Sequence, residues 1–202
     1  MKHVFLSFLL LTSTSLFAEG PEEEYTFYLI RENIRNLDYS SASDYAAQEL
    51  ICLIEEGHQI DPLNMSQLIE TLDHANVSSN STKVILKAID YHSPLTFDHL
   101  SALIAILDHA NPSDNATKIL LKAAEAQCPF QSEHLIALII TLNHANASNN
   151  ATKVLLKTIE CGAKYGSKER FFLAEASKAA NARNNVEKVR KALRERERKQ
   201  PF

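Results

Sequence analysis

The chain has 202 residues, including 21 Lys or Arg and 25 Asp or Glu, and its formal net charge is −4. This length is enough for one domain with a sizeable core, and the composition is typical of a soluble protein. The acidic balance argues against nucleic acid as the main partner. Glycine is scarce and tryptophan absent, whereas Leu, Ala, Ile, Lys and Glu are abundant, which favours helices.

Residues 1–18 have the pattern of a secretory signal peptide. A basic start at Lys2 precedes a short apolar run, and a small residue, Ala18, stands before Glu19. The apolar run is too short for a membrane span, which needs roughly 20 apolar residues. We therefore expect export to the periplasm or the exterior, with cleavage after Ala18. An uncleaved anchor is the alternative.

A repeat with a period of 35 residues follows, and it is strongest in residues 61–163. The motif Leu-Asp/Asn-His-Ala-Asn occurs at residues 72–76, 107–111 and 142–146, and Asn-Ser/Ala-Thr-Lys follows each copy at a fixed offset. A fixed period in this range is the signature of a solenoid. The sequence therefore predicts an all-α fold within residues 22–202: an α-solenoid of about five antiparallel helical hairpins.

Residues 25–58 form a weaker, N-terminal copy that we expect to cap the stack. Thr26 aligns with the first cap of the strong repeats, and Ile34 and Leu37 align with their apolar stripe. The segment 50–54 aligns with the second helix of the unit.

Each strong repeat is predicted to contain two helices. The first begins at a cap (Asp61 before Pro62, then Thr96, then Gln131 or Ser132) and carries apolar residues at steps of three, one and three. It is expected to end at an Asn in the left-handed conformation, at the Asn column. The second helix is expected to be capped by one of three polar residues, in the first strong repeat Ser78, Ser79 or Asn80. The Asn column comprises Asn76, Asn111 and Asn146.

Residues 164–199 resemble a terminal capping repeat. Ser167 is expected to cap its first helix, and its last helix keeps apolar residues only at Val186, Val189 and Leu193. From Lys164 onward there are 12 basic and 5 acidic residues, whereas residues 19–163 contain 8 basic and 20 acidic ones. Membrane contact is expected to be at most peripheral, through the basic C-terminal helix.

The 35-residue hairpin resembles tetratricopeptide and pentatricopeptide repeats in length and architecture only. The Trp, Leu-Gly and Tyr pattern of the tetratricopeptide unit is missing. The resemblance implies stacked helical hairpins, and it implies no particular partner.

Histidines recur in register but are expected to be structural. Repeats are on the order of 10 Å apart, whereas zinc needs ligands at about 2.0–2.1 Å, so one His per repeat forms no metal site. We expect these side chains to bond free carbonyls in a last helical turn. They are His74, His109 and His144, with His99 and His134 as a second set.

Six lysines form a stripe along three second helices and are the candidate binding residues. We favour an ion-pair ladder with Asp73 and Asp108, and the alternative is an anion-binding surface. Because Asn143 replaces the third Asp, Lys153 would be the least compensated. The stripe comprises Lys83, Lys87, Lys118, Lys122, Lys153 and Lys157.

The cysteines and the Asn-X-Ser/Thr triplets each leave two interpretations open. Cys128 and Cys161 could form a disulfide, although free thiols are favoured. Cys52 would then have no cysteine left to pair with in the chain. The triplets could carry glycans, although we favour helix capping as their explanation. They begin at Asn64, Asn76, Asn80, Asn115, Asn146 and Asn150.

No catalytic motif occurs in the sequence: there is no Gly-rich phosphate loop, paired-cysteine metal motif, nucleophile elbow or His-Glu-x-x-His. We therefore expect a non-enzymatic protein without a cofactor, whose stacked hairpins bind another protein. The alternative is an envelope-associated or ligand-binding protein that uses the lysine stripe or the basic C-terminal helix. An enzyme with an unrecognised pocket is the third interpretation.

Overall fold

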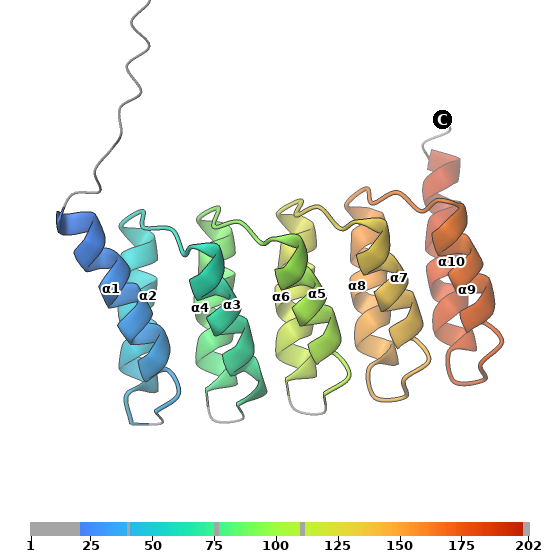
Figure 1. Ribbon diagram of the computed structural model, residues 1–202. Coiled ribbons are helices and arrows are strands. Elements are labelled where there is room, and N and C mark those ends of the chain that lie inside the picture. The colour runs from blue at the N-terminus through green and yellow to red at the C-terminus, as the bar shows by residue number, and fades with distance from the viewer. Residues whose placement is uncertain (1–20, 40, 75–76, 110–111, 200–202) are drawn as a thin grey trace, which may run out of the picture.

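The computed structural model describes residues 21–39, 41–74, 77–109 and 112–199, and all regular structure in these residues is helical (Figure 1). The signal-peptide prediction for residues 1–18 lies outside them. The elements are α1 (Pro21–Asn36), α2 (Ser43–Glu55), α3 (Pro62–Glu70), a short 3₁₀ helix (Thr71–Asp73), α4 (Ser78–Asp90), α5 (Phe97–Ile106), α6 (Ser113–Glu125), α7 (Ser132–Thr141), α8 (Ser148–Glu160), α9 (Ser167–Ala176) and α10 (Arg183–Lys199).

The helices form five antiparallel hairpins stacked side by side in two layers. Odd-numbered helices, the first of each hairpin, pack on one another, and even-numbered helices do the same behind them (Figure 1). From α4 onward the even-numbered helices begin 35 residues apart, at Ser78, Ser113, Ser148 and Arg183. The predicted all-α fold class is thus confirmed.

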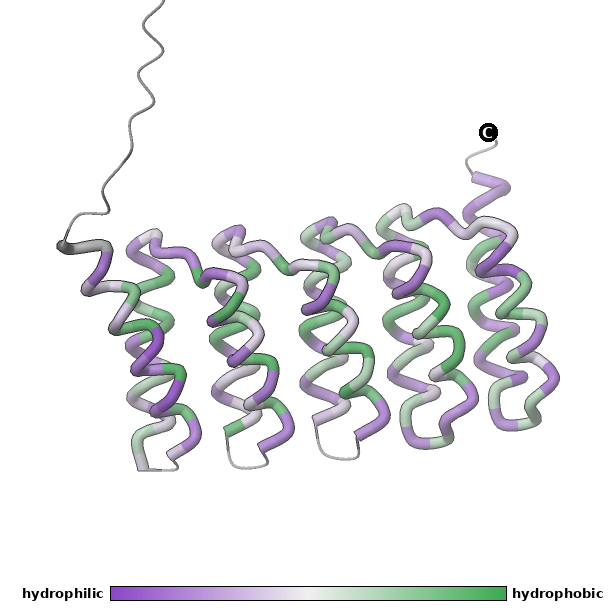
Figure 2. Tube along the Cα trace, in the orientation of Figure 1, coloured by the Kyte–Doolittle hydropathy of each residue, from purple (hydrophilic) through white to green (hydrophobic). Residues whose placement is uncertain are grey.

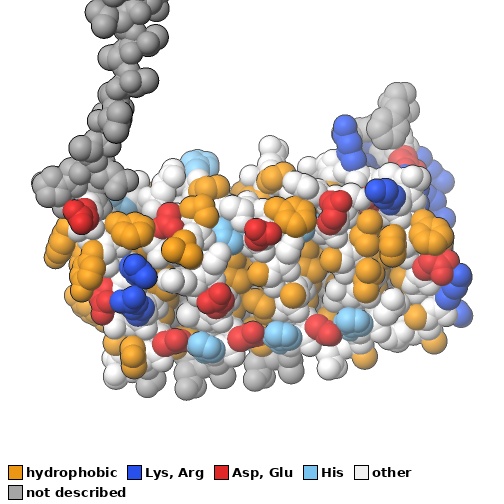
Figure 3. Space-filling model, viewed as in Figure 1, with side chains coloured by type: hydrophobic (Ala, Val, Ile, Leu, Met, Phe, Trp, Pro, Cys, Tyr) orange, Lys and Arg blue, Asp and Glu red, His pale blue; other side chains and the backbone are white. Residues whose placement is uncertain are grey.

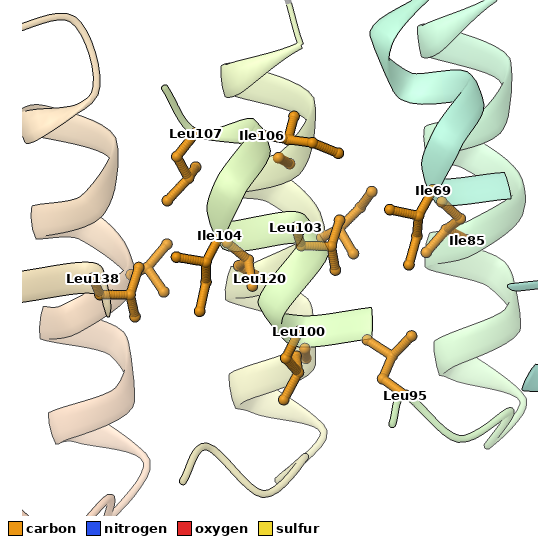
Figure 4. Packing of buried hydrophobic residues seen from close by; sticks show 14 of the residues in the cluster. Ile69, Ile85, Leu95, Leu100, Leu103, Ile104, Ile106, Leu107, Leu120 and Leu138 are labelled. Carbon is orange, nitrogen blue, oxygen red and sulfur yellow. The ribbon is translucent and has the colours of Figure 1, made fainter. Parts of the chain in front are cut away.

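The core runs the length of the stack because each inner hairpin is covered on two sides. Within α5, Leu103 lies toward Ile69 and Ile85 of the preceding hairpin, whereas Ile104 lies toward Leu138 of the following one (Figure 4). Burying each such side chain contributes about 1.5–3 kcal/mol relative to leaving it exposed. In Figure 2 this appears as hydrophobic colour on the facing sides of neighbouring helices.

In the strong repeats the first helices begin where the sequence predicted, but in the N-terminal and C-terminal repeats they do not. The Asp61 carboxylate accepts hydrogen bonds from the amides of Leu63 and Asn64, and Thr96 and Gln131 are the next caps. The prediction for Ser167 is wrong, since Gly166 is the cap there. The prediction for Thr26 is also wrong, because α1 begins at Pro21 and runs through it.

The left-handed residues stand after the second helices instead of the first. Helix α7 ends at Thr141, Asn146 lies in the following turn without a positive φ, and Asn76 and Asn111 lie outside the described residues. Positive φ angles occur after α2, α4, α6 and α8, and at each of these positions the chain closes the preceding helix as in a Schellman motif. The residues are Gly57 (99°), His92 (63°), Gln127 (59°) and Gly162 (99°).

The predicted side-chain caps of the second helices are wrong. Ser78 is already inside α4, and the preceding cap residue, Val77, makes no side-chain hydrogen bond. The same holds for Pro112 and Ala147 in the next two hairpins. The polar side chains at these helix starts are therefore available for contacts between hairpins.

Candidate functional site

The repeated histidines link successive hairpins. His74 Nδ1 lies 2.6 Å from a carboxylate oxygen of Asp38, and the two following hairpins repeat the pair at 2.7 Å (His109 with Asp73) and 2.9 Å (His144 with Asp108). Figure 3 shows the resulting row of alternating acidic and histidine side chains. The expectation that these histidines bond free carbonyls is therefore wrong, because the carboxylate one hairpin earlier is their partner.

His99 and His134 form a second link at the starts of α5 and α7. The Nδ1 atom of each accepts the backbone N–H of its own helix cap, Thr96 or Gln131, at 3.1 Å. The Nε2 atom is therefore the protonated one, and it donates to a backbone carbonyl one hairpin earlier, at 2.9 Å for His99 and 3.0 Å for His134. Their expected place in a last helical turn was wrong. Burial lowers the pKa of His134, which favours the neutral ring that this arrangement requires.

The asparagine of each Asn-Ser/Ala-Thr-Lys motif forms a third link. The Asn150 side-chain amide donates to Ser113 Oγ and to Asp114, both at 3.0 Å, at the start of the preceding even-numbered helix. Its own oxygen accepts from Lys153 at 3.1 Å. The equivalent residues Asn80, Asn115 and Asn185 make the same bond to a serine one hairpin earlier. This column was visible in the sequence, but helix capping was the wrong explanation for it.

The lysine stripe divides into two columns with different partners. Three lysines form ion pairs with an acidic residue at the end of the preceding even-numbered helix: Lys87 with Glu55, Lys122 with Asp90 and Lys157 with Glu125. These hydrogen bonds raise the lysine pKa values, and the bond from Lys157 lowers the pKa of Glu125.

The other three lysines, Lys83, Lys118 and Lys153, are exposed and donate to the asparagine of their own helix. The proposed pairing with Asp73 and Asp108 is wrong, since those carboxylates hold histidines. Lys153 is consequently no less compensated than its two equivalents. This column is the part of the stripe that can accept an anionic group from outside.

The cysteines are free thiols in the structure, and Cys128 and Cys161 line the same recess of about 330 Å³ between the third and fourth hairpins. Burial raises the pKa of Cys128, which disfavours its thiolate. A disulfide between Cys128 and Cys161 stays a prediction.

Three of the Asn-X-Ser/Thr triplets, those at Asn80, Asn115 and Asn150, use their asparagine amide to join hairpins inside the stack. Asn80 and Asn150 are both buried and both bond a buried serine of the preceding hairpin. A glycan on either nitrogen would displace that bond, so structural use of these asparagines is favoured over glycosylation in the folded chain.

The outward face of the odd-numbered helices carries exposed apolar side chains. Leu63 on α3 is 61% exposed, Ile140 on α7 is 44% exposed and Phe171 on α9 is 59% exposed. In α5 and α7 the only acidic residues are Asp98 and Glu133, both in the first turn. Figure 3 shows hydrophobic side chains distributed along this face of the stack, with acidic and basic side chains between them.

No described helix has the length and apolar content that a membrane span requires. Within the same residues, no three His, Cys, Asp or Glu side chains gather closely enough to hold a metal ion. Searches among protein-family models, curated proteins and solved structures found no match to this chain.

Proposed function

We propose that this chain is an exported, non-enzymatic helical-repeat protein that binds another protein along the outward face of its odd-numbered helices. The apolar character of that face carries the proposal. Exposed apolar residues scattered singly are ordinary, but their recurrence on successive helices of one layer favours an interaction surface. The signal-peptide pattern of residues 1–18 supports export.

The geometry of the stack suits an extended partner. Hairpins that contact only their neighbours present the same helix face again and again, which produces a long surface and not a closed pocket. Leu63, Phe97 and Ile140 lie on three successive odd-numbered helices and are 61%, 40% and 44% exposed. A partner with apolar side chains spaced along its length would match this row.

The test compares partner capture by variants of the two faces. The purified chain, the double variant Leu63→Ser/Ile140→Ser and the control Lys83→Ser/Lys118→Ser are immobilised and exposed to an extract of the native host. Each apolar anchor contributes on the order of 1 kcal/mol or more, so we expect at least about tenfold less of the captured partner on the double variant. The control alters the even-numbered helices and should retain the partner.

Equal recovery of the same protein on all three baits would contradict the proposal. Because all four substituted side chains are exposed, circular dichroism should show the same helix content in each variant.

A second candidate is an anion-binding protein that uses the exposed lysine column. The favouring observation is that Lys83, Lys118 and Lys153 donate to asparagine oxygens, which leaves their charge uncompensated by those partners. Salt-sensitive capture of an anionic partner would be lost on changing these three to Gln, and kept on changing Lys87, Lys122 and Lys157 to Gln. Unchanged capture by the first variant would exclude this candidate.

A further inference from the structure

The N-terminal end of the stack carries aromatic residues where inner hairpins carry polar links. One period before His74 stands Tyr39, and one period before Asn80 stands Tyr45. Their side chains are 64% and 70% exposed, since the described residues contain no hairpin before α1 and α2. Leu29, half-buried on α1, stands one period before Asn64 and two before His99. A terminal cap requires only a polar outer face, so exposed tyrosines in the linking columns call for another explanation.

The C-terminal end carries basic residues where inner hairpins carry the acceptors of those links. Lys178 stands in the column of Asp73 and Asp108, and Arg183 stands in the column of Ser78, Ser113 and Ser148. Both are exposed. Phe171 is the one apolar residue among these replacements. It stands in the column of Ser66, and the Ser66 hydroxyl lies 3.0 Å from His99 Nε2.

Arginines also replace apolar core residues at this end. Arg170 stands in the column of Leu100 and Leu135, and Arg190 stands in that of Leu120 and Leu155. With Arg194 they surround a recess of about 220 Å³ that is lined by Leu173 and Leu193. Their carboxylate partners belong to their own hairpin: Glu197 for Arg170, and Glu187 for Arg190 and Arg194.

The two ends have opposite charge. Residues 24–58 contain 7 acidic and 2 basic residues, whereas residues 164–199 contain 5 acidic and 12 basic ones. Two ends that were polar only for solubility would not need opposite signs. The opposite net charges of the two ends attract each other over about one Debye length, which is roughly 10 Å at 0.1 M salt.

We infer that the N-terminal end of one copy binds the C-terminal end of a second copy, in the register that joins successive hairpins. His74 and Asn80 contact residues 36 and 37 positions earlier. The same offsets, carried across five periods, place Tyr39 opposite Lys178 and Tyr45 opposite Arg183 of the other copy. They also place Leu29 opposite Phe171, by the 33-residue offset of the Ser66–His99 contact.

The chemistry of the paired positions fits this docking. A tyrosine ring attracts a lysine or arginine cation by about 0.5–1 kcal/mol at an exposed site, and Leu29 with Phe171 adds apolar contact. The contact is head-to-tail, so it produces linear oligomers instead of a closed dimer. It uses the ends of the stack and shares Phe171 with the partner face under the proposed function, but the variants that test it leave Phe171 and the other residues of that face unchanged.

The test is sedimentation velocity of the purified full chain at low salt, with variants that block one end each. The N-terminal variant is Tyr39→Ala/Tyr45→Ala, which removes the two rings, and the C-terminal variant is Lys178→Glu/Arg183→Glu, which removes the two cations. We expect the unmodified chain to form a concentration-dependent series of species at about 100 µM and above, because the cation–π contacts are individually weak and add to the charge attraction between the ends. Each variant alone should stay monomeric. Their equimolar mixture should form dimers and nothing larger, since each variant keeps one intact end.

The control Lys118→Glu/Lys153→Glu makes the same change in charge as the C-terminal variant but away from the ends, and it should associate like the unmodified chain. Raising the salt about tenfold should weaken association at least about tenfold. Three results would overturn the inference: a monomer at all concentrations, self-association of the C-terminal variant alone, which would indicate contact between two N-terminal ends, or a mixture that forms no dimer.

Discussion

The inner junctions of the stack and its last junction use the same columns in different ways. Between the first four hairpins, each junction has a His–Asp pair, an Asn–Ser bond and a Lys–acid pair. Among the described residues of the last junction, no ion pair crosses from the fourth hairpin to the fifth. Asn185 still bonds Ser148, and Arg196 donates to the carbonyls of Gly162 and Ala163. The comparison shows that the asparagine bond is the general link, and that the ion pairs are additions to it.

The core offers the largest contrast between the two kinds of junction. Leu103→Ala removes a fully buried side chain of an inner hairpin, and we expect it to lower the free energy of unfolding by about 3 kcal/mol. The equivalent Leu173→Ala should cost nearer about 2 kcal/mol, because a recess already borders Leu173. Urea unfolding of both variants measures the difference. Equal losses would mean that the last hairpin is packed as tightly as an inner one.

The asparagine column should matter equally at both kinds of junction. Asn150→Ala and Asn185→Ala each leave a serine hydroxyl and a lysine without their partner, and each should cost about 1–2 kcal/mol. Thermal unfolding provides the comparison, with exposed Asn146→Ala as the control. A loss at Asn150 alone would show that the last junction depends on other contacts.

The left-handed positions after the second helices, between successive hairpins, allow a matched test of backbone strain. His92 and Gln127 adopt positive φ angles that suit glycine better, so changing either to Gly should raise the free energy of unfolding by up to about 1 kcal/mol. Gly57→Ala and Gly162→Ala should lower it by about 1 kcal/mol or more. Opposite signs from urea titrations are expected, and the same sign in both pairs would contradict the backbone explanation.

Acid should weaken the junction between the third and fourth hairpins through His134. Its pKa in the folded chain is lowered from 6.5 by burial, so its contribution to stability is present above pH 6.5 and is lost as the pH falls below that value. Protonation of Nδ1 also removes the acceptor of the Gln131 amide. Urea midpoints between pH 7.5 and pH 5 should therefore fall less steeply in His134→Gln than in the unmodified chain. Parallel curves would exclude His134 as the titrating group.

Restoring a lysine at the last junction should have the smallest effect. Ala192 stands in the column of Lys122 and Lys157, beside a groove of about 550 Å³ that is lined by Leu156, Ile159 and Glu160. Ala192→Lys should pair with Glu160 and add about 0–0.5 kcal/mol, and the gain should disappear at high salt. Ala192→Met fills the groove without a charge and serves as the control. A gain that is equal for both would be packing and not pairing.

Much of this fold could be predicted from the sequence, because the three strong repeats carry the same pattern of apolar and helix-capping residues. The apolar stripe, Asp61 before Pro62 and the hairpin period correctly predicted where the first helices of the strong repeats begin. The roles of the polar columns were not readable, because His74 and Asp38 are 36 residues apart and meet only when one hairpin stacks on the next. From the local sequence such residues are predicted to cap helix ends, whereas in the stacked structure they bond the neighbouring hairpin.

The candidate partner face was missed for a related reason. Leu63, Ile140 and Phe171 occupy different positions in their helices, so no single column marks them as a group. They come to lie on one side of the molecule only because the odd-numbered helices that carry them form one layer (Figure 1). The sequence signal that could have indicated them is the low charge of α5 and α7 after their first turns.

The central claim is that the repeated polar residues join hairpins, and a double-mutant cycle on Asn150 and Ser113 tests it most directly. The two side chains are 3.0 Å apart across the junction between the third and fourth hairpins. If their hydrogen bond links the hairpins, the losses caused by Asn150→Ala and Ser113→Ala should overlap, with a coupling of about 0.5–1.5 kcal/mol. Strictly additive losses, with a coupling near zero, would contradict the claim.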